Sequence, residues 1–200
     1  MARLREAPLS GFTYADVVNV MRDVLGFTPG WPSTAEALAG LRDGTFLTKQ
    51  AAPEDDDSTA KLAIACGETD NPRLPLLWPV AARIADHFTP YFGASWTYIS
   101  QACATWPGHD DDRYAGPFNR KTAAPLLLVS SRFDAASSYE RAQHVEHTLG
   151  NARLLTVEGV GHTQATIDSP CADHAIERYL VSGVLPAPGA VCTDQPNPFD

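Results

Sequence analysis

The sequence predicts an α/β fold, in which helical segments are followed by the last parallel strands and helices of a sheet. Two short apolar runs, at residues 126–129 and 153–157, flank a helical pattern at residues 138–149, which indicates a strand, a helix and a second strand. The first run is apolar at every position, as strands are when both faces of a parallel sheet are buried. A chain of 200 residues is long enough for one domain with a hydrophobic core.

Helical patterns account for much of the remaining chain. Thr13, followed by Asp16, predicts the cap of a helix that ends near Gly26. Ser33, with Glu36 reaching back to it, predicts the cap of a second helix that ends at Gly44. Residues 74–106 are rich in aromatic side chains and interrupted by prolines, so we expect short helices there. A last helix is predicted over residues 172–182, where a glycine follows. Residues 52–58 form an acidic run that predicts a solvated linker.

Charge and hydropathy exclude two classes of partner. The net charge of −9 at pH 7 would repel a phosphate backbone, so we expect no nucleic acid. The longest apolar stretches fall far short of the roughly 20 residues that a membrane-spanning helix needs, so we expect no membrane partner. The first 25 residues also lack the pattern of a secretory signal.

The four cysteines point to an oxidising compartment. Cys66, Cys103, Cys171 and Cys192 are dispersed, with no CxxC spacing that would favour a metal. An even number of such cysteines favours two disulfides, although four buried thiols remain an alternative. Disulfides in a chain without an export signal lead to the hypothesis that the N-terminus seen here is not the original one.

Candidate catalytic side chains follow the two predicted strands. Asp134 lies in the polar segment after the first strand, and His162 lies in a glycine-containing loop after the second, 28 residues later. Open α/β sheets place reactive groups at the carboxyl ends of their strands. A carboxylate beside an imidazole can hold the tautomer that a general base needs. A turn residue and an ordinary loop histidine are the alternatives for either residue taken alone.

The sequence resembles the carboxyl-terminal part of the tripeptidyl aminopeptidase-like serine peptidases, which have the α/β-hydrolase fold. The likeness covers much of the chain, and its motifs are specific when taken together. It rests on Cys103-Ala104-Thr105-Trp106-Pro107, Pro125-Leu126-Leu127-Leu128-Val129 through Asp134, Tyr139-Glu140-Arg141-Ala142, Gly159-Val160-Gly161-His162, Ser169-Pro170-Cys171, residues 179–186 and residues 188–192.

By this resemblance, Asp134 is the acid and His162 the base of a catalytic triad that hydrolyses peptide bonds near a free N-terminus. Residues 1–110 correspond to the helical cap or lid region, and residues 111–200 to the α/β-hydrolase portion that carries the acid and base loops. The resemblance and the cysteines together predict an extracellular protein without a cofactor. One mild departure from the family's pattern is Ala135-Ala136-Ser137, where a Pro or Thr commonly precedes the helix.

The nucleophile of the triad is missing from the sequence. Enzymes of this fold carry a serine in a GxSxG turn that precedes the acid and the base along the chain, and no GxSxG occurs here. The nearest imitation is Gly93-Ala94-Ser95-Trp96-Thr97, which has Thr in place of the last Gly. Without a nucleophile there is no covalent route, so we expect no peptidase activity from these 200 residues alone.

Other clusters of titratable residues give weaker predictions of a metal or substrate site. The run His109-Asp110-Asp111-Asp112 and the pair His144 and His147 offer no converging ligand set, so no metal site is predicted. Glu68 and Asp70 are candidates to pair with the free α-amino group of a substrate, with simple solvent exposure as the alternative.

Sequence proximity favours two disulfide pairs, Cys66 with Cys103 and Cys171 with Cys192, each within one structural part. For function, the main hypothesis is one portion of a secreted serine exopeptidase that acts on peptides with a free N-terminus. Its nucleophile lies on sequence absent here: either this chain is a truncated part of a longer one, or a separately made N-terminal half is its partner. The alternatives are a non-catalytic binding module derived from a hydrolase and a small hydrolase that uses Ser95 or another serine.

Overall fold

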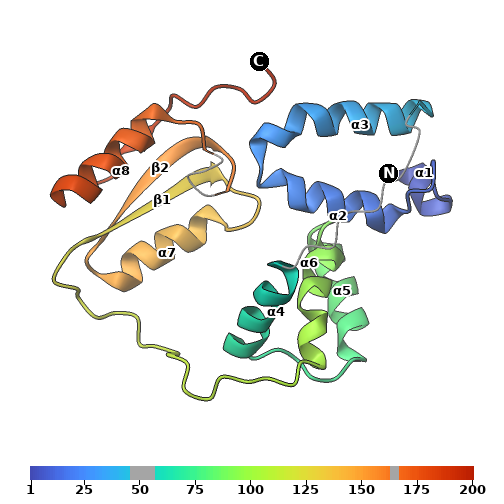
Figure 1. Ribbon diagram of the computed structural model, residues 1–200, viewed down its shortest axis with the longest axis horizontal. Helices are drawn as coiled ribbons and strands as arrows, with labels where there is room; N and C mark the ends of the chain where they lie inside the picture. Colours follow the sequence, from blue (N-terminus) through green and yellow to red (C-terminus); the bar gives the residue numbers. More distant parts are fainter. Residues whose placement is uncertain (46–56, 163–166) are drawn as a thin grey trace. The chain divides into compact units, whose positions relative to one another are not determined.

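The computed structural model describes residues 1–45, 57–162 and 167–200, which form two compact units. The first unit comprises residues 1–22 and 41–115, and the second comprises residues 23–40 and 116–200. Most of the predicted acidic linker, residues 52–56, lies outside the described residues. The helices and strands are traced along the chain in Figure 1.

The first unit is helical, as predicted. In this unit α5 (Leu77–Phe88) and α6 (Gly93–Ile99) pack so closely that a Cβ at Gly93 would come within 2.2 Å of the carbonyl of Ala85, which requires glycine there. The disulfide between Cys66 and Cys103 ties α4 to the short 3-10 helix η2, and confirms the first predicted pair. The elements that lie wholly in this unit are α1 (Ala2–Glu6), α4 (Asp57–Glu68), α5 (Leu77–Phe88), α6 (Gly93–Ile99) and η2 (Ser100–Ala104).

Helices α2 (Tyr14–Leu25) and α3 (Trp31–Asp43) each cross a boundary between the units in sequence, and the 3-10 helix η1 (Thr28–Gly30) lies between them, in the second unit. The predicted cap of α2 is confirmed, since the Thr13 N–H donates to Asp16 Oδ2 (2.8 Å) and the Asp16 N–H donates to Thr13 Oγ1 (3.2 Å). The predicted cap of α3 is wrong. The turn η1 runs directly into the helix at Trp31, and the Ser33 hydroxyl donates to the Gly30 carbonyl instead of accepting a helix N–H.

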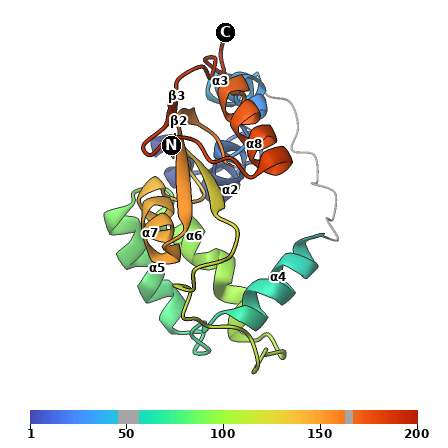
Figure 2. The same ribbon diagram turned by 90° about the vertical axis from the view of Figure 1, so that its left-hand side faces the viewer.

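The second unit contains a parallel three-stranded sheet in the order β1-β2-β3, which confirms the predicted α/β class. The strands are β1 (Leu126–Phe133), β2 (Ala152–Val160) and β3 (Val191–Cys192). Helices α7 (Tyr139–Leu149) and α8 (Pro170–Ser182) lie on opposite sides of the strands (Figure 2). Glycines in the left-handed region end both helices, Gly150 at φ 64° and Gly183 at φ 69°.

Both predicted strands are longer than the apolar runs that identified them. Residues 130–133 were expected to be a polar turn, but they continue β1, because Ser131 pairs with Val157 and Phe133 with Val160 across an irregularity in the register. Ser130 and Ser131 are buried although they are polar, and the Ser131 hydroxyl satisfies its hydrogen-bonding capacity on the Gly161 carbonyl. The polar turn therefore begins only at residue 134.

The core of the second unit lies between the sheet and α8. Leu155 and Val157 of β2 are 2% and 0% exposed, and they pack with Ile167, Ala172 and Cys192. Side chains of the opposite face of β2 meet α7, where the Tyr139 hydroxyl lies 2.7 Å from Thr156 Oγ1. Burial of both faces of β2 explains why its sequence lacks the alternation of a half-exposed strand. Among the described residues, no helix is both long and apolar enough to cross a membrane.

Candidate active site

The second unit brings Asp134 and His162 together. Asp134 follows β1 directly, and His162 follows β2 after Gly161, which adopts a positive φ of 104° that a residue with a side chain rarely tolerates. Because the strands are parallel neighbours, their carboxyl ends meet at one edge of the sheet. Asp134 Oδ2 lies 2.9 Å from His162 Nδ1, which is the separation of a hydrogen bond.

The carboxylate of Asp134 is buried and heavily hydrogen-bonded, with 4% of its side chain exposed. Oδ1 accepts the backbone N–H groups of Ala136 (2.7 Å) and Ser137 (2.9 Å), and Oδ2 accepts the Ser137 hydroxyl (2.8 Å). Burial raises the pKa of Asp134, but the hydrogen bonds from His162, from these two N–H groups and from the hydroxyl lower it further, so the net pKa lies below its ordinary value. The acid is therefore held ionised beside the imidazole.

The imidazole of His162 is partly accessible, with 41% of its side chain exposed. Its backbone is held in place because its N–H donates to the Gly26 carbonyl (3.0 Å), which belongs to the same unit. With Nδ1 directed at Asp134, the tautomer with the proton on Nδ1 is favoured, which leaves Nε2 as the proton acceptor. An imidazole arranged in this way can take a proton from a hydroxyl and return it to a leaving group.

Ser137 is a residue of this site that the sequence reasoning did not single out. Its hydroxyl donates to Asp134 and lies 3.4 Å from His162 Nδ1. The acid loop at residues 134–137 closes through the two backbone N–H bonds to Asp134. The signal available in the sequence was a serine three residues after an aspartate, a pattern that commonly closes a local turn around the carboxylate.

Ser95, the serine in the segment most similar to a GxSxG turn, forms structural hydrogen bonds in the first unit. Its hydroxyl donates to Asn19 Oδ1 (2.8 Å) and accepts from Arg22 Nη1 (3.0 Å). An amide oxygen is not a general base, and a guanidinium cannot take a proton, so neither partner activates the hydroxyl. Asp70, a candidate for binding an α-amino group, forms an ion pair with Arg113 (2.9 Å).

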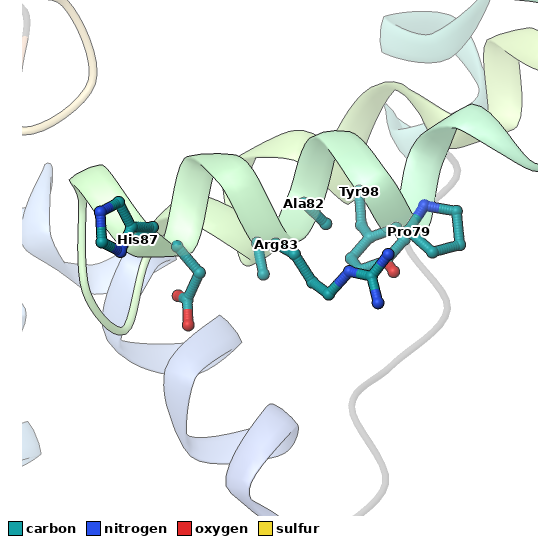
Figure 3. A pocket seen from close by; sticks show the side chains of 7 residues that line it. Pro79, Ala82, Arg83, His87 and Tyr98 are labelled. Atoms are coloured by element: carbon teal, nitrogen blue, oxygen red, sulfur yellow. The ribbon is translucent and has the colours of Figure 1, made fainter.

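Pockets occur in both units. A pocket of 550 Å³ adjoins the acid loop in the second unit, and its lining includes Arg132, Phe133, Asp134 and Tyr139. The first unit has a pocket of 380 Å³ between α5 and α6, which the sequence reasoning did not identify (Figure 3). Its lining is Pro79, Ala82, Arg83, Asp86, His87, Ala94 and Tyr98.

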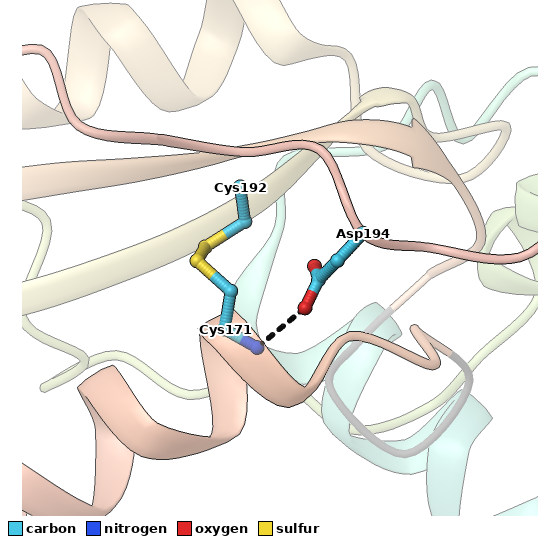
Figure 4. Close-up of side chains that lie close together, drawn as sticks. All are labelled: Cys171, Cys192 and Asp194. Atoms are coloured by element: carbon cyan, nitrogen blue, oxygen red, sulfur yellow. Dashed lines mark hydrogen bonds between the residues drawn. A yellow bond between two sulfur atoms is a disulfide. The ribbon is translucent and has the colours of Figure 1, made fainter.

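Within the described ranges, Cys171, Cys192 and Asp194 place potential metal-ligating atoms within 4.8 Å of one another. The two cysteines form a disulfide, which confirms the second predicted pair and removes their thiolates as ligands. Asp194 instead caps α8, where its Oδ1 accepts the Ser169 hydroxyl (2.5 Å) and its Oδ2 accepts the Cys171 N–H (2.7 Å; Figure 4). The cluster is a structural joint between helix and tail.

The cap made by Asp194 is expected to depend on pH. Hydrogen bonds from Ser169 and then from the Cys171 N–H lower the pKa of Asp194 in the folded protein. The unfolded state therefore binds more protons, so the contribution of the cap is complete above the ordinary pKa and disappears as pH falls through the folded pKa. Urea unfolding between pH 6 and pH 2 should show a smaller loss of stability with falling pH in Asp194→Asn than in the wild type. Parallel curves for the two proteins would contradict this.

Comparison with known proteins gives one consistent result. Residues 89–192 match the model of a family described as TAP-like protein. The chain is 26% identical over 216 residues to tripeptidyl aminopeptidases of Streptomyces lividans and Streptomyces coelicolor, covering 98% of this chain and 39% of the relative. It is also 26% identical to carboxylesterase B of Mycobacterium tuberculosis, over 91% of this chain and 38% of that protein. The chain thus spans well under half the length of these relatives.

Proposed function

Because the chain belongs to the TAP-like protein family and forms part of an α/β-hydrolase fold, we propose that it is the carboxyl-terminal portion of a secreted serine exopeptidase. In this proposal Asp134 is the triad acid and His162 the triad base. The observation that carries the proposal is the 2.9 Å contact between Asp134 Oδ2 and His162 Nδ1 at the shared edge of β1 and β2. The hydrogen bond orients the imidazole and stabilises the imidazolium that forms when the nucleophile is deprotonated.

The nucleophilic serine comes from outside these 200 residues in this proposal. The chain has no GxSxG sequence, and the relatives that it matches are more than twice as long. Within the described residues β1 pairs only with β2, although it is an eight-residue parallel strand with an apolar beginning. Strands of this kind are usually flanked on both sides, so the free edge of β1 is suited to the polypeptide that carries the serine.

The proposed substrate is a peptide with a free N-terminus, as the name of the Streptomyces relatives implies for those proteins. The carboxylesterase relative makes ester hydrolysis the second candidate reaction. Both reactions use the same acid, base and serine, since both pass through attack of a hydroxyl on a carbonyl carbon. Two disulfides are compatible with the proposed extracellular location.

The decisive experiment co-expresses this chain with the serine-bearing remainder of the Streptomyces lividans tripeptidyl aminopeptidase. We expect the pair to hydrolyse a tripeptidyl p-nitroanilide with a free N-terminus, and each part alone to be inactive. His162→Ala should abolish the activity, because no other group deprotonates the serine. His144→Ala is the matched control, since His144 is an exposed histidine on α7, and it should leave activity unchanged.

Three outcomes would contradict parts of the proposal. Hydrolysis by the 200-residue chain alone would refute the external nucleophile. A co-purifying pair that is inactive, or whose activity survives His162→Ala, would refute the catalytic role and favour a binding module. Faster cleavage of p-nitrophenyl butyrate than of the tripeptidyl substrate, or equal cleavage of its N-acetylated form, would assign ester or endopeptidase chemistry instead.

A further inference from the structure

The side chain of Gln195, in the carboxyl-terminal tail, grips the loop that carries His162. Its Oε1 accepts the Val160 N–H (2.6 Å) and its Nε2 donates to the Val160 carbonyl (2.8 Å). We propose that Gln195 is a positioning residue, which holds the base loop so that His162 stays aligned with Asp134. The inference rests on the proposed function for its catalytic consequence, but its structural consequence can be measured without catalysis.

Beyond the end of β3, the carboxamide of Gln195 takes the place of a neighbouring strand beside β2. In the parallel ladder, Thr156 is paired with Val191 and Val157 with Cys192. Gln195 lies three residues beyond Cys192, and Val160 lies three residues beyond Val157, so the contact keeps the register of the ladder. A primary amide offers one N–H donor and one C=O acceptor toward a neighbour, as a peptide group does. The side chain therefore extends the sheet by one pairing, up to the residues before His162.

The tail that carries Gln195 is anchored immediately before it. The disulfide between Cys171 and Cys192 joins the tail to α8, and Asp194 accepts hydrogen bonds from the start of the same helix (Figure 4). Two hydrogen bonds to the backbone of Val160 define the orientation of the Gln195 side chain. The contact between Gln195 and Val160, called the clamp below, thus connects the loop of His162 to a tail that a disulfide holds in place.

The lack of a side chain at Gly159 leaves room for the Gln195 amide. A Cβ at this position would lie 1.9 Å from Gln195 Oε1, so any larger residue would displace the amide. The other side of the loop is held by the Ser131 hydroxyl, which donates to the Gly161 carbonyl (2.6 Å), and by the bond from the His162 N–H to Gly26. Residues 160, 161 and 162 are therefore each fixed by a separate partner, and Gln195 supplies the first.

The test compares Gln195→Ala, Gln195→Glu and Gly159→Ala with the wild type. Long-range ¹H–¹⁵N NMR of the 200-residue chain measures the tautomer of neutral His162. We expect the Nδ1–H form in the wild type and a mixture of tautomers in Gln195→Ala and Gly159→Ala, because both lose the clamp. Gln195→Glu keeps the acceptor for the Val160 N–H but loses the donor, so an intermediate result is expected. Asn197→Ala is the matched control, since the Asn197 amide bonds within the tail: it donates to Asp200 Oδ1 and accepts the Phe199 N–H.

Kinetics of the co-expressed pair supply the second measurement. Gln195→Ala should lower kcat by about tenfold or more with little change in KM, because a misaligned base slows the proton transfer and not the binding. The double variant Gly159→Ala/Gln195→Ala should be no worse than either single variant, since both remove one interaction. Two independent losses of stability would add, so a non-additive result shows that both substitutions remove the same contact.

The outcomes separate the two proposals. Altered tautomers in an inactive pair would support the positioning role and refute the proposed function. A pair whose activity requires His162, but whose kcat and tautomer are unchanged by Gln195→Ala, would overturn the positioning role. If Gln195→Ala fails to fold, Gly159→Ala and Gln195→Glu decide the question, and unchanged tautomers in both would also overturn it.

Discussion

Replacement of Asp134 by Asn is expected to lower kcat of the reconstituted enzyme by about 10³- to 10⁴-fold. An asparagine has nearly the same shape, but its amide group can present N–H donors where the carboxylate accepts the Nδ1 proton. The imidazole then adopts the other tautomer, with the proton on Nε2, and cannot act as a base toward the serine. The imidazolium also loses the neighbouring negative charge that stabilises it.

The measurement is kcat at saturating tripeptidyl substrate, with circular dichroism as the check on folding. Glu158→Gln is the matched control, because Glu158 is an exposed carboxylate that pairs with Arg132 near the same end of the sheet (3.1 Å). It should leave kcat unchanged. An Asp134→Asn variant that retains a tenth of the activity would contradict the triad role, since an acid that only closes its loop would be replaced well by Asn.

Replacement of Leu155 by Ala should cost the second unit about 3 kcal/mol of stability, within the range of buried leucine truncations. Leu155 is 2% exposed in the central strand of the sheet and packs against Val157, Ile167 and Cys192. Its loss removes apolar contacts and leaves a cavity, because the disulfide to Cys171 and the paired strands restrict how far the surroundings can collapse.

Hydrogen exchange of the β2 amides reports this loss for the second unit separately from the helical unit. Leu180→Ala is the matched control, because Leu180 lies on α8 with 74% of its surface exposed. Its effect should stay within about 0.5 kcal/mol, as for surface substitutions. A Leu155→Ala variant as stable as this control would show that the described cluster is not the core of the unit.

The local elements were predictable because their signals are local. Capping at Thr13, the left-handed stop at Gly183, and the apolar runs of β1 and β2 all act over a few neighbouring residues. The cysteine pairs were predictable for a related reason, since each joins the partner nearest in sequence. The start of α3 was not, because it depends on a 3-10 turn that leads into the helix without a polar cap.

The extent of the strands depended on partners distant in sequence. Ser130 and Ser131 look like a turn, yet the ladder with β2 carries β1 through them, because backbone pairing does not require apolar side chains. The division into a cap region at residues 1–110 and an α/β-hydrolase portion at residues 111–200 stays a prediction. In the structure, residues 23–40 group with the carboxyl-terminal unit, through contacts such as the ring pair of Trp31 and Phe199.

Residue types, spacing and chain order were enough to select Asp134 and His162 and to reveal that no nucleophile turn accompanies them. Their separation, the hydroxyl of Ser137 between them and the amide of Gln195 behind the base loop emerged only in three dimensions. Hydrogen bonds act over about 3 Å, so a separation of 28 positions between acid and base says nothing of such contacts until parallel strands bring their ends together.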